Sequence, residues 1–236
     1  MNYKKLSIII PVFNEGQTVG LVIDRLLKVN FPQGWIIEVI AVNDGSTDTT
    51  ASVLDRFSSK IKVIHLVKNS GKGSAVKAGI EASTGDYAII QDADLECAPE
   101  EIPLLLKPLE EIAPETKIAV MGSRELNKGG ECEKSQFLSR LGSLSITKLI
   151  NILYGSSLTD ALMGYKLFPR ATFGYFVTGR FEAEMIFITK LLKEGYKIVE
   201  VPVSYNPRGR NTGKKIRYLD GVKIIVRIVY FWATGR

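Results

Sequence analysis

Two aspartates separated by one residue, Asp92 and Asp94, follow the short apolar run 87–90. Carboxylates with this spacing at the end of a strand can both reach one divalent cation, and their hard oxygen atoms favour Mg²⁺ or Mn²⁺. Glu96 could supply a third oxygen. A cation with open coordination positions would bridge the phosphates of a nucleoside diphosphate and stabilise it as a leaving group. Such pairs are common by chance, so the prediction depends on their position after a strand.

Asp44 lies in the polar segment 43–48, which follows another apolar run. Thr47 or Asp48 is suited to cap the helix that follows. That leaves Asp44 without a structural task, and a carboxylate at a strand end can accept a hydrogen bond from a base or a ribose hydroxyl. We therefore predict that Asp44 contacts a nucleotide.

Lys72 lies in the glycine-containing segment 69–74, directly before a predicted helix. The first N–H groups of a helix suit an anion, and the lysine adds positive charge. The glycine spacing matches neither the P-loop nor the dinucleotide fingerprint, which disfavours a plain NAD-binding module.

The predicted elements bring these residues together. Apolar runs predict strands, and helical spacing predicts the helices between them, in the order 7–10, 19–27, 36–42, 49–57, 61–66, 73–82 and 87–90. This alternation predicts an α/β fold with an open, mostly parallel sheet and helices on both faces. Ligands of such sheets bind at the carboxyl ends of the strands, where all the polar clusters lie.

The second half of the chain is less regular. Strands are expected at 118–121 and 197–201, and helices at 138–153 and 181–192. No linker or repeat interrupts the chain, so we expect one catalytic domain over residues 1–205 and an appendage over 206–236. The appendage holds eight basic residues against Asp220 and ends in the apolar run 224–233. That run is too short to cross a bilayer but suits an amphipathic segment lying on its surface.

The composition limits the function classes. The chain has 236 residues, of which 45% are hydrophobic and 24% charged, which is typical of a folded protein. The net charge of +6 is too small to indicate nucleic-acid binding, but it fits a protein that handles phosphates or an anionic surface. Two cysteines without metal-finger spacing, and no apolar signal segment, lead us to expect a cytoplasmic protein, peripheral at the inner face of the membrane.

The polar segments in combination resemble glycosyltransferase family 2 of the GT-A fold, and most closely its dolichyl-phosphate mannose synthase branch with the bacterial polyprenyl-phosphate sugar transferases. The motifs that carry the resemblance lie at 11–15, 43–48, 69–73 and 92–95. Shorter motifs follow in the family's order at 122–124, 158–160, 164–165 and 195–203. The resemblance therefore spans nearly the whole chain.

The resemblance implies roles for individual residues. The nucleotide would be bound by Pro11, Phe13, Glu15, Asp44, Lys72 and Asp92. The metal would be held by Asp92, Asp94 and Glu96. The acceptor phosphate would be bound by Arg124, Arg140 and Arg208, the last in a mobile basic loop at 206–215. Asp94 and Asp160 would be the catalytic carboxylates, with Asp160 near the acceptor.

Two positions depart from the family. Mannose synthases commonly have glutamine where this chain has Glu96, and tyrosine where it has Phe13. The donor and the metal therefore stay open. We expect inverting transfer of a hexose from a UDP- or GDP-sugar to a polyprenyl phosphate. The alternatives are transfer to a saccharide hydroxyl in polysaccharide synthesis, and nucleotide-sugar binding without catalysis.

Overall fold

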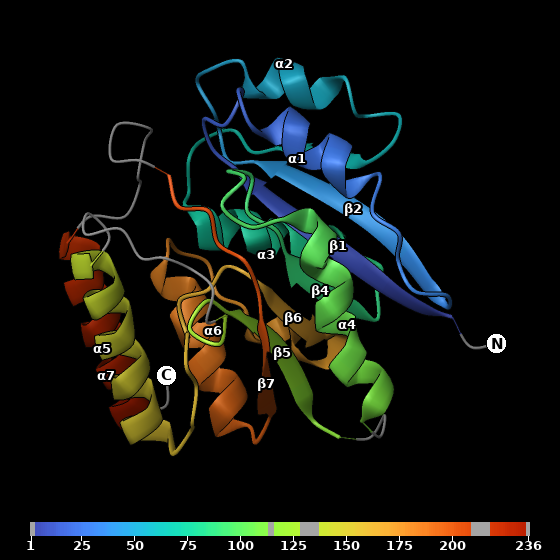
Figure 1. The fold of residues 1–236 in the computed structure, drawn as a ribbon. Coiled ribbons are helices and arrows are strands. Elements are labelled where there is room, and N and C mark those ends of the chain that lie inside the picture. The colour runs from blue at the N-terminus through green and yellow to red at the C-terminus, as the bar shows by residue number, and fades with distance from the viewer. Residues whose placement is uncertain (1–2, 113–115, 128–136, 209–217, 235–236) are drawn as a thin grey trace.

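The computed structural model describes residues 3–112, 116–127, 137–208 and 218–234. A seven-stranded sheet crosses the molecule in the order β3-β2-β1-β4-β6-β5-β7 (Figure 1). The strands are β1 Lys4–Val12, β2 Trp35–Asn43, β3 Lys62–His65, β4 Tyr87–Ile90, β5 Ile118–Ser123, β6 Lys166–Pro169 and β7 Lys197–Pro202. All neighbouring strands are parallel except that β6 runs antiparallel to both β4 and β5.

Helices cover both faces of the sheet, as the alternation predicts. They are α1 Val19–Leu26, α2 Thr50–Asp55, α3 Lys72–Ala82, α4 Ile102–Glu111, α5 Phe137–Tyr154, α6 Glu182–Lys193 and α7 Tyr218–Thr234, with 3-10 turns at Pro99–Glu101 and Arg170–Tyr175. The apolar stripes of α1, α2 and α4 pack against one face. Those of α3 and α6 pack against the other. The fold class expected from the sequence is confirmed.

Two elements were not expected from the sequence. Helix α4 begins near Pro103 and contains Pro108, which obscures its helical pattern. Strand β6 has only four residues and ends at Pro169, so its apolar run is too short to recognise. It matters for function because it inserts between β4 and β5 and brings the second half of the chain beside the acidic cluster.

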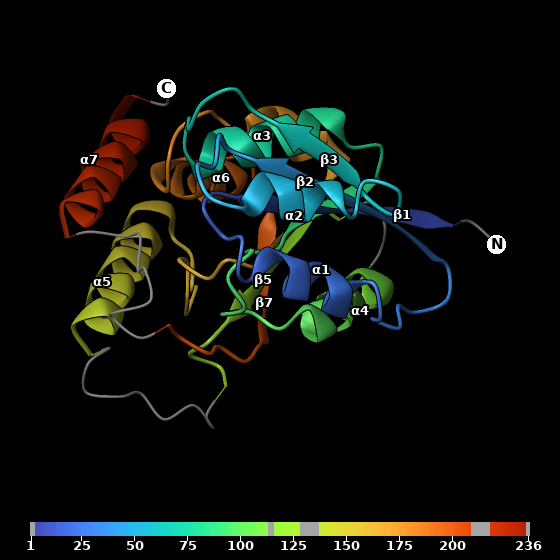
Figure 2. The same cartoon turned by 90° about the horizontal axis from the view of Figure 1, so that it is seen from above.

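Helices α5 and α7 lie side by side at one end of the molecule in both views (Figures 1 and 2). Ile224 and Ile228 of α7 are fully buried in a small core shared with α5 and α6. The apolar run near the C-terminus is therefore helical and docked on the domain. Within the described residues, no helix is long and apolar enough to cross a membrane.

Candidate active site

The first candidate residues follow β1, which carries Pro11 half-buried in register with Val42. After the half-buried Phe13, the chain turns through Asn14, whose φ of 51° lies in the left-handed region that asparagine tolerates. This turn is tied to the segment after β2, because Asn14 Oδ1 accepts a hydrogen bond from Thr47 N at 2.8 Å. The turn leads to Glu15, whose side chain is almost fully buried.

Asp44 shapes the next loop. Its two carboxylate oxygens accept hydrogen bonds from the backbone N–H groups of Ser70 and Gly71, each at 2.8 Å. Burial raises the pKa of Asp44, and these two bonds offset part of that effect. Gly71 has a φ of 96°, and a Cβ there would lie 2.7 Å from the Gly179 carbonyl oxygen. Asp44 therefore holds the turn before α3, while its contact with a nucleotide remains a prediction.

Lys72 begins α3 and reaches into the site. Its Nζ lies 2.7 Å from Asp92 Oδ1 and 2.7 Å from Glu184 Oε1. Burial would lower the pKa of Lys72, but the charges of Asp92 and Glu184 outweigh that and raise it. Glu184 is buried and also binds Lys166, at 2.7 Å. The sequence does not identify the pairing of Glu184 with Lys166.

Asp94 is the crowded carboxylate of the acidic cluster. Burial, together with the charges of Asp92 and Glu96, raises its pKa to about 7. Leu95 between them has a φ of 65°, an uncommon conformation for a branched residue and of a kind concentrated at functional sites. The turn lets Asp94 Oδ1 accept a hydrogen bond from Glu96 N at 3.1 Å.

The segment after β7 covers the cluster. Glu96 accepts hydrogen bonds from Tyr205 Oη at 2.7 Å and from Arg208 N at 3.0 Å. The Arg208 guanidinium donates to the Asp94 carbonyl oxygen at 3.0 Å and binds both oxygens of Glu15, at 3.2 and 2.6 Å. Arg208, expected to bind the acceptor phosphate, thus contacts Glu15 and Asp94, which are expected to bind the nucleotide and the metal. The rest of the predicted basic loop, from residue 209, lies outside the described residues.

The residues expected to hold a metal fit its chemistry but are not gathered around one point. Three carboxylates supply the hard oxygen atoms that Mg²⁺ and Mn²⁺ prefer, and burial together with the charges of Asp92 and Glu96 raises the pKa of Asp94. However, Asp92 turns to Lys72, and Glu96 turns to Tyr205. In the described part of the chain, no three histidine, cysteine or acidic side chains are arranged to hold an ion. Binding one through all three carboxylates requires these side chains to turn.

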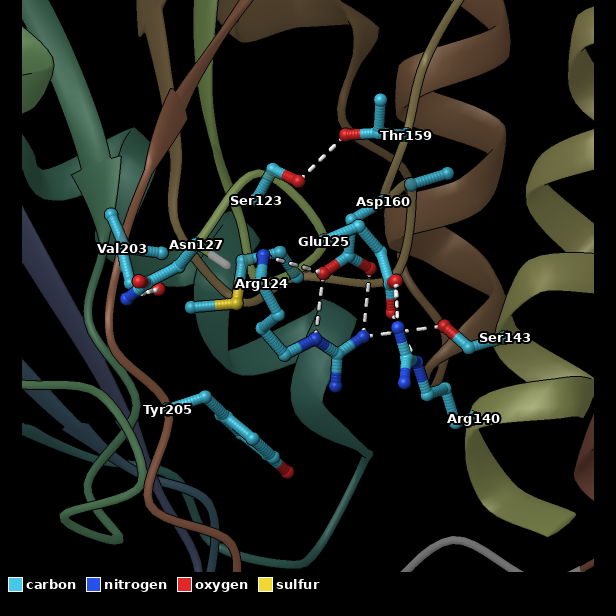
Figure 3. Close-up of polar contacts among 12 residues, drawn as sticks. Ser123, Arg124, Glu125, Asn127, Arg140, Ser143, Thr159, Asp160, Val203 and Tyr205 are labelled. Atoms are coloured by element: carbon cyan, nitrogen blue, oxygen red, sulfur yellow. Dashed lines mark hydrogen bonds and ion pairs between the residues drawn. The ribbon is translucent and has the colours of Figure 1, made fainter. Parts of the chain in front are cut away.

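A second group contains Arg124, Arg140 and Asp160, which the sequence predicts to lie near the acceptor (Figure 3). Arg124 binds the buried Asp160 through two nitrogens, Nε to Oδ2 at 2.6 Å and Nη2 to Oδ1 at 2.7 Å. Arg140 on α5 binds Glu125 in the same bidentate way, at 2.9 and 2.5 Å. A hollow of about 370 Å³ adjoins this group, lined in part by Glu125 and Thr159.

Tyr205 connects the two groups, and the sequence does not identify it. Its hydroxyl donates to Glu96. The centre of its ring lies 4.8 Å from the Arg124 guanidinium carbon, and Figure 3 shows the two residues. Glu200 on β7 holds the backbone of the segment that carries Asp160, because it accepts hydrogen bonds from Thr159 N and Asp160 N at 2.7 and 2.8 Å. Each of these contacts joins segments at least 40 residues apart, so no local pattern could reveal them.

Solved structures define the class of fold. Over 97% of its length, the chain matches the crystal structure of glucosyl-3-phosphoglycerate synthase from Mycobacterium tuberculosis in complex with Mn²⁺, UDP and phosphoglyceric acid. The TM-score is 0.71, with 78% of that chain covered and 20% identity. The mixed sheet, with its acidic cluster at the strand ends, is therefore the GT-A fold.

The family follows from the sequence comparisons. The model of glycosyl transferase family 2 matches residues 7–173, and the chain belongs to this family of enzymes. Human dolichyl-phosphate beta-glucosyltransferase is 30% identical over 221 residues, 86% of this chain and 67% of that protein. Dolichol-phosphate mannosyltransferase of Pyrococcus furiosus is 32% identical over 226 residues, 89% of this chain and 59% of that protein. The chain thus spans only part of the length of these relatives.

Proposed function

We propose that this protein transfers a hexose from a UDP- or GDP-sugar to a polyprenyl phosphate, with inversion, at the cytoplasmic face of a membrane. The observation that carries the proposal is the pairing of an acidic cluster and Lys72 with a separate arginine group, joined through Tyr205. The relatives named as dolichyl-phosphate transferases support the acceptor class.

On the donor side, the residues around Asp44 and Glu15 would bind the nucleotide, and Lys72 would lie beside the diphosphate. Mg²⁺ or Mn²⁺, held by Asp94 with Asp92 and Glu96, would supply positive charge to the departing diphosphate.

On the acceptor side, Arg124 and Arg140 would bind the phosphate. A phosphate oxygen is already ionised near neutral pH, so it can attack the anomeric carbon without a strong base, forming one C–O bond as the bond to the diphosphate breaks. Asp160 fits this chemistry because both its oxygens are occupied by Arg124. A saccharide hydroxyl would need a base, and a carboxylate held in this way is poorly placed to act as one.

A transfer assay tests the proposal. UDP- and GDP-hexoses are supplied with a short-chain polyprenyl phosphate in detergent, with Mn²⁺ or with chelator, and the glycolipid is measured. Product is expected only with the phosphorylated acceptor and the metal. Transfer to the unphosphorylated polyprenol or to an oligosaccharide at an equal rate would contradict the proposed acceptor. Nucleotide binding without any transfer would favour the non-catalytic alternative.

A further inference from the structure

Lys166, the first residue of β6, is a lysine with a 2% exposed side chain. Its Nζ binds Glu184 Oε2 at 2.7 Å and also donates to the Met163 carbonyl oxygen. A charged lysine in such a position is costly unless it is paired and hydrogen-bonded. The roles proposed above assign nothing to this residue.

Glu184 shares its charge between two lysines. Its second oxygen, Oε1, binds Lys72 Nζ, which in turn binds Asp92 Oδ1. Four side chains therefore form one line of alternating charges. The line starts at Lys166 on β6, continues through Glu184 and Lys72, and ends at Asp92 in the acidic cluster. The two positive and two negative charges sum to zero.

The far end of this line is held in a fixed place. Lys72 binds one oxygen of Asp92, and the other packs against Gly164, where an added Cβ would lie 2.2 Å from Oδ2. Burial alone would raise the pKa of Glu184, but the charges of Lys166 and Lys72 hold it below its ordinary value. Both lysines thus keep the glutamate ionised.

We propose that Lys166 is a positioning residue for donor binding: it neutralises Glu184, so that the charge of Lys72 stays available to Asp92 and to the diphosphate. This inference rests on the proposed function, in which Lys72 lies beside the donor diphosphate. Without Lys166, Lys72 would be the counterion of two carboxylates, and the line would carry a net negative charge toward an anionic ligand. Charge repulsion at this depth is poorly screened.

The test is calorimetry of UDP and GDP binding in the presence of Mn²⁺. Lys166→Met is expected to weaken binding of the preferred nucleotide about tenfold, or about 1.4 kcal/mol. Lys166→Arg keeps the charge and should bind within about threefold of the wild type. Lys166→Met combined with Glu184→Gln removes one charge of each sign, and binding should return to within about threefold of the wild type.

Removing the negative charge of Glu184, instead of the positive charge of Lys166, separates the proposed positioning role of Lys166 from a purely structural one. Glu184→Gln alone should tighten nucleotide binding, since Lys72 is then paired with Asp92 only. Thermal melts report whether each variant folds. If Lys166→Met lowers stability without changing affinity, or if Glu184→Gln weakens binding as much as Lys166→Met, the inference is wrong. If Lys166→Met does not fold, Glu184→Gln decides it: tighter nucleotide binding supports the inference, and binding equal to or weaker than that of the wild type contradicts it. A wild type that binds neither nucleotide overturns the proposed function and this inference with it.

Discussion

At the scale of single residues, Asp94 has the burial and the neighbouring negative charges that are expected of a ligand for a cation. It is largely buried beside two other carboxylates, and the next residue, Leu95, has a φ of 65°. A buried carboxylate with like charges around it destabilises the fold unless a positive charge or a bound proton compensates for it. Proteins retain such arrangements mainly at functional sites, because a bound cation relieves the repulsion.

Replacing Asp94 with asparagine tests this assignment. Asp94→Asn should abolish metal-dependent nucleotide binding and transfer, while the melting temperature stays the same or rises because one repelling charge is gone. Asp24→Asn, at an exposed position on α1, is the matched control and should change neither. Near-normal transfer by Asp94→Asn would remove Asp94 from the metal site.

At the scale of elements, the segment after β7 joins the two halves of the site through Tyr205. The hydroxyl and the ring make different contacts, one with Glu96 and the other with Arg124. Because a single substitution can remove the first and keep the second, the two contacts can be tested separately.

Tyr205→Phe should weaken metal and nucleotide binding several-fold and leave the acceptor KM unchanged, since only the hydrogen bond to Glu96 is lost. Tyr205→Leu removes the ring as well, which forfeits roughly 0.5–2 kcal/mol of cation–π interaction with Arg124, and should also raise the acceptor KM. Steady-state kinetics with each substrate varied in turn measures both effects. Equal behaviour of the two variants would show that the ring does not position Arg124.

Glu38 on β2 connects β1 with the turn before β4. It accepts hydrogen bonds from Ser7 Oγ at 2.6 Å and from the backbone and hydroxyl of Thr84, at 2.8 Å each. Burial would raise the pKa of Glu38, but these bonds, with Lys5, lower it from 4.5 to about 2. The stabilisation is therefore present above pH 4.5 and is lost as the pH falls toward 2.

Glu38→Gln should lower the free energy of unfolding by about 1–3 kcal/mol at pH 7. The difference from the wild type should shrink as the pH falls below the unfolded-state pKa. Urea unfolding at several pH values measures it. Glu81→Gln, at an exposed position of α3, is the control and should show little change at any pH. A constant difference between pH 7 and pH 3 would mean that ionisation of Glu38 contributes nothing.

At the scale of the whole molecule, exposed apolar side chains gather on the paired helices α5 and α7. The large ones are Leu141, Leu144, Ile152, Ile225, Val226, Val229, Tyr230 and Trp232. Basic side chains at Lys223 and Arg227 are exposed on the same helix α7. This composition is typical of a surface that lies on an anionic bilayer, and it supports the proposed peripheral contact.

Vesicle co-sedimentation tests that contact. The protein should bind vesicles containing anionic lipid at low salt and dissociate as salt rises, because each basic residue near the surface contributes about 1 kcal/mol. Val226→Ser combined with Trp232→Ser should weaken binding at least tenfold, since burying one such side chain is worth about 1.5–3 kcal/mol. Val67→Ser, at an exposed position in the loop after β3, is the control. Equal binding by all three proteins would exclude α7 as the contact.

The sequence by itself determined the features that are local in the chain. Strands β1 to β4 each combine an apolar run with a polar residue at its end. The alternation of strands and helices along the chain, the α/β class and the acidic cluster around Asp94 could therefore be predicted before the fold was known. The family followed from several such motifs in order, and the comparisons confirm it.

Only the tertiary structure decided how the charges are paired. Lys166 meets Glu184 across 18 positions, Arg124 meets Asp160 across 36, and Arg208 meets Glu15 across 193. The first pair forms because α6 packs beside β6, and the second because the segment before β6 lies beside the end of β5. The third forms because the segment after β7 returns beside the turn that follows β1. A charged side chain can be listed from the sequence, but its partner depends on which segments the sheet brings together, and that partner decides whether the charge is free to bind a ligand.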